Sequence, residues 1–285
     1  MKVNKNAVLI VVGVILAAIA VFAVYGLVTR HGIPNEPAQQ ADISAPAAGQ
    51  GESESEYLAS AVNYEKTADL LKAREAYQKL IEKYPGSNNI SRNQESLENL
   101  NIAILFSPIP TADSFFYEVQ KGDTLTRIAK SFNTTVDLIS RSNNLKDPGL
   151  KAGRKLKITK AKFSMIIDKS QNILTLKSDQ DILKTYRAST GKNSCTPTGT
   201  FAVTNKIIDP PWYPSAGGVI PANDPKNVLG SRWIGISKQG YGIHGTIDPE
   251  SIGKGVTEGC VRLKNSDVEE LYSIVPAGAE VIIVD

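Results

Sequence analysis

The residues that most constrain this chain lie at its N-terminus, where residues 7–28 form an uncharged, almost wholly apolar run. At 1.5 Å per residue, a helix of this length spans about 33 Å, which is enough to cross the hydrocarbon core of a membrane. Lys2 and Lys5 precede the run. A cleaved signal peptide has a shorter apolar stretch of about 7–15 residues. We therefore expect a single transmembrane helix, an uncleaved signal anchor over residues 1–30, with a cleaved signal peptide as the alternative.

The charges beside this run predict its orientation. Because positively charged flanks stay in the cytoplasm, residues from about 30 onward would lie on the outer side of the membrane, in the cell envelope. Residues 31–54 are rich in Ala, Pro, Gly, Gln and Ser and end in an acidic stretch. Such a composition cannot bury enough apolar surface to fold, so we predict a flexible linker there.

The remaining composition is that of a globular protein. The chain has 285 residues, which leaves room for about two modest domains and smaller modules. Hydrophobic residues make up 41% and charged residues 21%. The net charge is only +3, whereas a protein that binds nucleic acid usually carries a clustered basic face. We therefore expect no nucleic acid among its partners.

Apolar residues recur three or four positions apart in residues 55–107, which predicts a short α-helical region. Those before the break at Pro85-Gly86 are Tyr57, Ala61, Tyr64, Leu70, Ala73, Tyr77, Leu80, Ile81 and Tyr84. A further helix is expected over residues 92–105. The first two helices resemble one tetratricopeptide-type hairpin, which would offer a surface to a protein partner. Since one such unit cannot bury its own face, a small bundle that spaces or oligomerises is the alternative.

Residues 113–159 have the pattern of a small βααβ module. Residues 116–119 and 155–158 alternate like strands. Between them, residues 124–132 and 135–142 are expected to be helices with one apolar side. The expected order is therefore strand, helix, helix, strand.

This module resembles a LysM domain through the run YEVQKGDTLTRIAKSFNTTVDLISRSNNL and the ending LKAGRKLKI. The resemblance implies binding to a glycan that contains N-acetylglucosamine. The groove would lie between one loop formed by Gly122, Asp123 and Thr124 and another that holds Asn144 and Leu145. A degenerate module that serves as a spacer is the alternative.

From residue 162 onward, short alternating segments separated by turn residues predict a β-rich sandwich or barrel. The expected strands are residues 163–168, 173–176, 182–188, 201–204, 232–236 and 281–284. Ser266 and Glu269 form a capping box that would begin a short helix ending near Ile274.

Residues 207–230 form a long connection that contains five prolines. Connections of this length inside a compact domain are uncommon and often functional. We expect a lid that brings Trp212 and Tyr213 over a cleft, and an idle surface loop is the alternative.

Histidine and cysteine are scarce, with two residues of each type. His31 adjoins the apolar run, so cysteine–histidine chemistry in the folded part must use His244. A histidine beside Cys260 could remove the thiol proton and create the thiolate nucleophile. No CxxC pair indicates zinc. Cys195 is expected to be a spare thiol, with a redox partner for Cys260 as the alternative.

Glycines flank both candidate catalytic residues. Gly259 leaves room for substrate and permits a sharp turn, so the amides of Gly259 and Cys260 could hold the oxyanion of a tetrahedral intermediate. No Asp or Asn is obviously placed to orient the imidazole, and the carbonyl of Gly245 could do so instead. Arg262 follows Cys260 by two residues, shares its strand face and could bind a carboxylate.

Five segments of residues 162–285 together resemble the YkuD-type L,D-transpeptidase domain. They are STGK at 189–192, TPTGTF at 196–201, LGSRWIG at 229–235, IHGT at 243–246 and TEGCVRL at 257–263. The resemblance implies a β-rich catalytic domain that acts on peptidoglycan stem peptides. It implies no metal and no organic cofactor.

The resemblance also implies roles for particular residues. Cys260 would attack the carbonyl before the terminal D-alanine of a tetrapeptide stem, His244 would be its base, and Gly245 would orient that base. An amine from another stem would then take the acyl group and form a 3→3 crosslink. Gly259 and Cys260 would frame the oxyanion site, and the residues expected at the substrate are Arg262, Thr257, Thr246, Trp233 and Tyr241.

The sequence departs from the family pattern at two positions. Glu258 stands where the family often has a basic or neutral residue, and we expect its carboxylate to point away from the sulfur because a nearby negative charge would raise the pKa of the thiol. Val228 replaces a frequent proline before Leu-Gly, which could loosen the lid.

Several functions remain open for the same site. Water as acceptor would make an L,D-carboxypeptidase, and an envelope protein as acceptor would make a protein-to-wall attaching enzyme. A non-catalytic scaffold that binds peptidoglycan is a further alternative.

Overall fold

The computed structural model describes residues 52–285, except for 148, 215–216 and 223. The predicted signal anchor and most of the predicted linker lie outside these residues. None of the helices within the described ranges combines the length and the apolar character that crossing a bilayer requires. The last predicted linker residues are not linker, because Ser53 is the N-cap of a helix and forms a capping box with Glu56.

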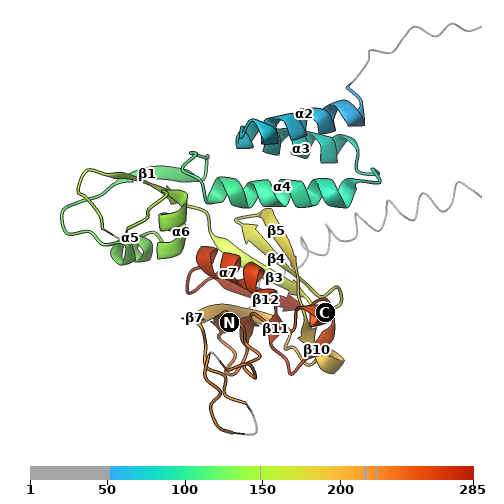
Figure 1. Ribbon diagram of the computed structural model, residues 1–285, viewed down its shortest axis with the longest axis vertical. Coiled ribbons are helices and arrows are strands. Elements are labelled where there is room, and N and C mark those ends of the chain that lie inside the picture. Colours follow the sequence, from blue (N-terminus) through green and yellow to red (C-terminus); the bar gives the residue numbers. More distant parts are fainter. Residues whose placement is uncertain (1–51, 148, 215–216, 223) are drawn as a thin grey trace, which may run out of the picture. The chain divides into compact units, whose positions relative to one another are not determined.

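The helical region consists of α2 (Glu54–Lys66), α3 (Leu70–Lys83) and α4 (Ile90–Leu105) (Figure 1). Tyr57, Ala61, Tyr77 and Leu80 form its apolar core, together with Leu100 from α4. The expected helices are therefore present, and α4 covers the hairpin of α2 and α3, which buries the face that one hairpin alone would expose.

The βααβ order predicted for residues 113–159 is confirmed. Its elements are β1 (Ser114–Glu118), α5 (Leu125–Ser131), α6 (Val136–Ser142) and β2 (Lys155–Thr159). The two strands pair antiparallel, and residues from all four elements or their flanks form a core of their own. The ammonium group of the buried Lys157 donates to the carbonyls of Ile104 at 3.0 Å and Ser107 at 2.8 Å. These bonds join the module to the C-terminal end of α4.

The remaining residues form a mixed eight-stranded sheet with the strand order β11-β9-β8-β7-β12-β3-β4-β5. In chain order the strands are β3 (Phe163–Asp168), β4 (Ile173–Ser178), β5 (Asp181–Arg187), β7 (Gly199–Ile208), β8 (Arg232–Ile236), β9 (Gly242–His244), β11 (Val261–Arg262) and β12 (Glu280–Val284). Two short strands, β6 (Thr190–Gly191) and β10 (Gly255–Thr257), pair separately. Strand β12, although last in the sequence, pairs with β3 on one side and with β7 on the other.

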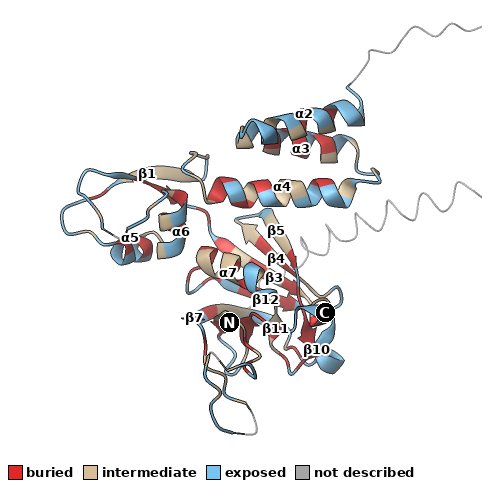
Figure 2. Ribbon diagram, viewed as in Figure 1, coloured by how far each residue is buried: buried red, intermediate tan, exposed pale blue. Residues whose placement is uncertain are grey.

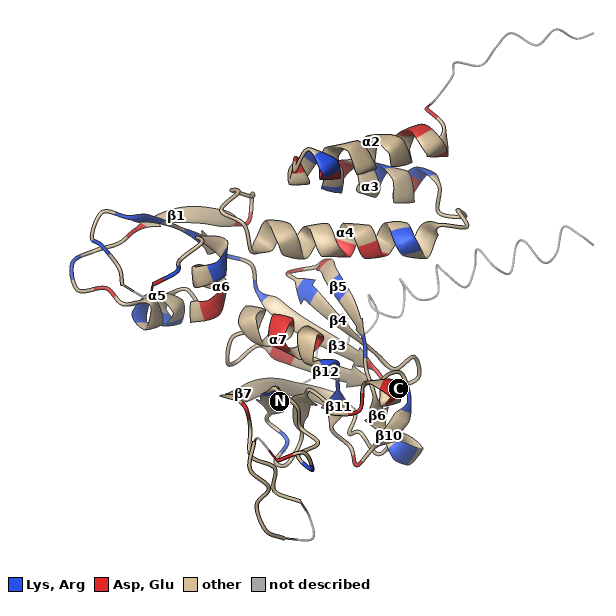
Figure 3. Cartoon of the chain, viewed as in Figure 1, with Lys and Arg blue, Asp and Glu red and all other residues tan. Residues whose placement is uncertain are grey.

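Helix α7 (Asn265–Ile274) packs against this sheet and closes its core (Figures 1 and 2). Val268, Leu271 and Ile274 are fully buried among the strand side chains. Helix α7 also carries acidic residues (Figure 3), of which Glu270 faces β5 and pairs with Lys184 at 2.9 Å.

Two sequence expectations need correction here. Strand β7 continues to Ile208, four residues beyond its predicted end, because its outer half pairs with β8. The predicted capping box of Ser266 and Glu269 does not form. The N-cap of α7 is Lys264, which makes no side-chain cap bond, and Asn265 is already helical.

Candidate active site

Two neighbouring strands bring Cys260 and His244 together. Strands β9 and β11 run parallel, with Val261 level with Ile243 and Arg262 level with His244. Cys260 directly precedes β11, so the same register places it level with Gly242. Because side chains alternate between the faces of a sheet, Cys260 and His244 lie on one face, one diagonal step apart. The indole of Trp233 occupies the space above Gly242, where a Cβ would lie 2.6 Å from its Cζ2 atom.

The imidazole of His244 is buried, with 3% of its surface exposed. Its Nδ1 lies 2.7 Å from the carbonyl oxygen of Gly245, as the sequence predicted. Burial lowers the pKa of His244 to about 4, and the nearby Arg262 charge acts in the same direction. The ring is therefore neutral at pH 7. Since a carbonyl only accepts, Nδ1 carries the proton, and Nε2 keeps the lone pair that a base needs.

Trp233 lies nearly parallel to this ring. Its indole stacks on the imidazole, with the ring centroids 6.1 Å apart and the planes 15° from parallel. The stacking follows from the sheet register, because Trp233 of β8 is the cross-strand partner of His244.

Cys260 is partly exposed and rests as a neutral thiol. Burial raises the pKa of the thiol above its ordinary value; the Gly242 amide opposes this rise and the Glu258 carboxylate adds to it. The thiol donates to the carbonyl of Gly240 at 3.6 Å. Among the described residues, no hydrogen bond joins this sulfur to His244. Proton transfer therefore needs a contact between the sulfur and His244 that is not formed here, and catalytic hydrogen bonds often tighten only when substrate binds.

The turn before Cys260 differs from the sequence prediction. Thr257 is buried, and its hydroxyl donates to the carbonyl of Cys260 at 2.6 Å while it accepts from the Gly259 amide at 3.2 Å. The Gly259 amide already has a partner, so it is not a free donor for an oxyanion. Thr257 shapes the turn and does not line the cavity at Cys260. The backbone of Gly259 has φ +124°, which favours glycine.

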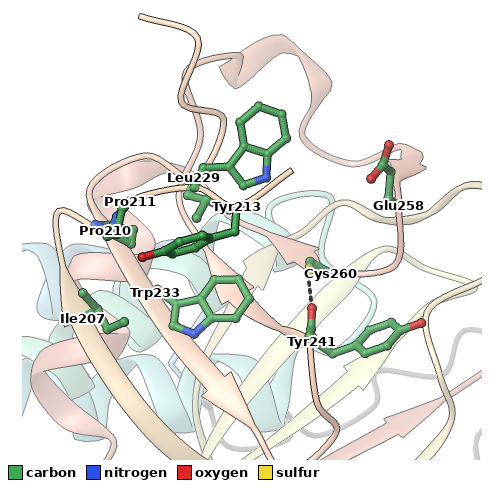
Figure 4. Close-up of a pocket in the computed structure, with 11 residues that line it drawn as sticks. Ile207, Pro210, Pro211, Tyr213, Leu229, Trp233, Tyr241, Glu258 and Cys260 are labelled. Atoms are coloured by element: carbon green, nitrogen blue, oxygen red, sulfur yellow. Dashed lines mark hydrogen bonds between the residues drawn. The ribbon is translucent and has the colours of Figure 1, made fainter. Parts of the chain in front are cut away.

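A cavity of about 600 Å³ opens at Cys260 (Figure 4). The residues that line it are Ile207, Pro210, Pro211, Trp212, Tyr213, Leu229, Trp233, Gly240, Tyr241, Glu258 and Cys260. Trp233 and Tyr241 are therefore where the sequence placed them, and the long connection supplies Trp212 and Tyr213 as expected of a lid. Glu258 lines the same cavity as Cys260, and its carboxylate is directed away from Cys260 in Figure 4.

Two other predicted substrate residues do not line this cavity. Thr246 is buried, and its hydroxyl bonds to the backbone of Asp248. Arg262 extends to the loop after β9, where its Nη1 donates to the Ser251 hydroxyl at 2.9 Å. It lines a separate cavity of about 350 Å³ together with Asp248, Glu250, Ser251, Lys254 and Val256. Its charge still acts on both Cys260 and His244, where it lowers the pKa of each group.

Asn265 supports the site, and sequence reasoning did not find it. Its side-chain oxygen accepts from the amides of Ser231 at 3.2 Å and Thr246 at 3.0 Å, and its nitrogen donates to the Thr246 carbonyl at 2.9 Å. A Cβ on Gly245 would collide with this oxygen. Asn265 thus holds the backbone next to the carbonyl that orients His244. An Asn at the start of a helix usually indicates an N-cap, so nothing in the sequence indicated that Asn265 bonds to two distant loops.

Cys195 is exposed, and the structure has both cysteines as free thiols. Its sulfur lies 3.9 Å from the Thr257 carbonyl, so its loop packs against the turn that carries Cys260.

The predicted glycan-binding residues of the LysM-like module occupy its two loops. Asp123 accepts from the Tyr117 hydroxyl at 2.7 Å and from the Gln120 amide at 2.8 Å, and Thr124 is the N-cap of α5. Asn144 has positive φ, and Leu145 packs on the module core. Gly122 also has positive φ, and its carbonyl accepts from Arg127. Each of these residues therefore has a structural task.

Comparisons with known proteins agree with this geometry. Residues 162–283 match the L,D-transpeptidase catalytic domain YkuD, and residues 117–159 match the LysM domain. The putative L,D-transpeptidase YkuD of Bacillus subtilis is 36% identical over 174 residues, which cover 59% of this chain and 97% of the relative. The chain belongs to the YkuD family of L,D-transpeptidases.

Membership of the YkuD family makes the chain an acyltransferase.

A second relative, the putative L,D-transpeptidase YqjB of B. subtilis, is 39% identical over 127 residues, covering 42% of this chain and 70% of YqjB. A solved L,D-transpeptidase from Mycobacterium smegmatis is 25% identical and covers 47% of this chain and 64% of that one, with a TM-score of 0.37.

Proposed function

We propose that this enzyme crosslinks peptidoglycan through a cysteinyl acyl-enzyme and makes 3→3 bonds between stem peptides. The observation that carries the proposal is the position of Cys260, which opens on a cavity of about 600 Å³ from the strand next to the neutral, oriented imidazole of His244. A cavity of this size holds a peptide end of a few residues.

In the first step, Cys260 loses its proton to Nε2 of His244, and the sulfur attacks the carbonyl before the terminal D-alanine. The imidazolium that forms still donates its Nδ1–H to the Gly245 carbonyl, and this hydrogen bond stabilises the charged ring. The carbon–nitrogen bond then breaks, His244 returns the proton to the nitrogen of D-alanine, and D-alanine leaves. The remaining acyl group is held as a thioester on Cys260.

In the second step, an amine of another stem attacks the thioester carbon. A new amide bond forms, the carbon–sulfur bond breaks, and a proton from the amine passes through His244 to the sulfur. The aromatic residues over the cavity would limit access of water, which would otherwise hydrolyse the thioester.

The other modules would position the catalytic domain on peptidoglycan. We propose that the LysM domain holds glycan strands through the loops at Gly122–Thr124 and Asn144–Leu145, and that the apolar residues 7–28 anchor the chain in the membrane. The catalytic domain would then act in the cell envelope on the outer side of that membrane. The helical region, with its tetratricopeptide-like hairpin, would be the surface for a protein partner.

Intact mass spectrometry of the purified full-length chain with purified muropeptides tests the proposed activity. We expect the mass of one stem acyl group on wild type and none on Cys260→Ala. Crosslinked dimers support the transpeptidase, whereas tripeptides alone would identify an L,D-carboxypeptidase and an acylated envelope protein an attaching enzyme. Absence of any acylation would leave a non-catalytic peptidoglycan-binding scaffold.

A further inference from the structure

The charge of the cavity at Cys260 is carried by one residue. Among the described residues that line it, Glu258 alone is charged, and the others are aliphatic, aromatic, proline, glycine or the thiol itself. Glu258 is exposed, and no hydrogen bond or ion pair to it is present in the part of the chain that the structure describes. Its carboxylate is therefore free to bind a ligand.

Aromatic rings make up much of the remaining wall. Trp212, Tyr213, Trp233 and Tyr241 all line the cavity. The faces of aromatic rings carry partial negative charge and attract cations, and the attraction is stronger where water is excluded. A carboxylate at the edge of an aromatic cavity is thus suited to bind an ammonium group.

The positions of the groups agree with this chemistry. In Figure 4, Glu258 stands on one side of Cys260, and Tyr213, Pro210 and Pro211 stand on the other. The carboxylate and the aromatic wall therefore belong to one cavity that opens at Cys260.

Two cations near the site do not line this cavity. The ammonium group of Lys238 lies 5.8 Å from the centroid of the Tyr241 ring, but Lys238 does not line the cavity. Arg262 lines the separate cavity at Ser251. Among the described residues, no lining cation neutralises Glu258.

We propose that the cavity at Cys260 is an ammonium-binding site in which Glu258 selects stem peptides that carry a free amine. This inference rests on the proposed function. The ammonium group could belong to the side chain of the third residue of the donor, or to the amine of the acceptor. In the acceptor case, the bound ammonium loses one proton to solvent, its nitrogen then forms the amide as the carbon–sulfur bond breaks, and its second proton ends on the sulfur.

The test compares the full-length wild type with Glu258→Gln, which keeps the shape of the side chain and removes its charge. Glu280→Gln, an exposed carboxylate on β12 outside the cavity, is the matched control. The first measurement is the rate of Cys260 acylation by two tetrapeptide donors, one with a free side-chain amine and one with that amine acetylated. The second is the ratio of crosslinked to hydrolysed product at a fixed acceptor concentration.

The first ratio compares the acylation rate of the free-amine donor with that of the acetylated donor, and the second compares crosslinked with hydrolysed product. Because an exposed charge pair contributes up to about 1 kcal/mol, we expect one of these two ratios to fall about fivefold in Glu258→Gln and neither to change in Glu280→Gln. A fall in the preference for the free-amine donor assigns the ammonium to the donor, and a fall in crosslinking relative to hydrolysis assigns it to the acceptor. Removing the charge also changes thiol reactivity, but that change acts equally on both donors and cancels in the ratio.

Acylation of wild type with both ratios unchanged in Glu258→Gln would overturn the ammonium site and leave the transpeptidase intact. Failure of wild type to be acylated by either donor would instead refute the proposed function, and the ammonium site with it.

Discussion

Replacement of Asn265 by alanine should loosen the catalytic site from a position that touches neither the nucleophile nor the base. The change removes the acceptor of the Ser231 and Thr246 amides and the donor to the Thr246 carbonyl. A typical hydrogen bond contributes about 1 kcal/mol, and unpaired backbone groups cost more when they are buried. Asn265 itself is exposed, so water can replace part of the loss. We expect the free energy of unfolding to fall by about 2 kcal/mol.

Urea unfolding followed by tryptophan fluorescence measures this change in the catalytic domain, because both tryptophans of the chain, Trp212 and Trp233, lie there. With a urea dependence of about 2 kcal/mol per molar, the midpoint should fall by about 1 M. The acylation rate should fall as well, since the Gly245 carbonyl that orients His244 is next to the released backbone. Lys264→Ala, at the adjacent exposed position without a side-chain cap bond, is the control. A midpoint for Asn265→Ala no lower than that of Lys264→Ala would refute the reasoning.

Three further outcomes are expected. Since His244 has a pKa of about 4 when folded and about 6.5 when unfolded, the unfolded state binds more protons between these values, so stability should fall by up to about 3 kcal/mol as the pH drops from 6.5 to 4. A His244→Gln variant that kept this pH dependence would contradict the assignment. The raised pKa of Cys260 predicts that its alkylation by iodoacetamide still accelerates above pH 9, and a plateau near pH 7 would show a thiolate instead. Gly259→Ala should cost about 2 kcal/mol of stability and suppress alkylation, because φ is +124° and the new Cβ would lie 2.7 Å from the Tyr241 ring; an unchanged urea midpoint would argue against this strain.

The sequence predicted the helices and the longer strands, but not the short strands β6, β9, β10 and β11, and it singled out Cys260 and His244 as the candidate pair. Alternating apolar residues and turn residues predicted the longer strands. A strand that buries one face repeats apolar residues at every second position, and this pattern can be read from neighbouring residues alone. Cys260 and His244 were found because the chain has so few residues of either type, and Gly245 because no polar side chain near His244 could orient the ring.

The remaining parts of the site depend on contacts that no local pattern records. The Thr257 hydroxyl accepts from the Gly259 amide because a turn places the two groups next to each other. The residue types alone do not specify that turn. Arg262 leaves the cavity at Cys260 because Ser251, on a separate loop, accepts from it. Asn265 joins two loops that are distant in sequence. Such hydrogen bonds follow from the completed sheet and cannot be predicted before it is known.

The central place of β12 has a consequence for how this domain comes into being. While the chain is being synthesised, β3 and β7 are made long before the strand that must lie between them, so the sheet cannot close until residues 280–284 have appeared. Strands β9 and β11, which carry His244 and adjoin Cys260, pair onto β8 and β7 without β12, but among the described strands β12 alone joins this half of the sheet to β3, β4 and β5. Loss of residues from that strand would therefore divide the sheet between β7 and β3 and leave Cys260 and His244 on a half-sheet separated from β3, β4 and β5.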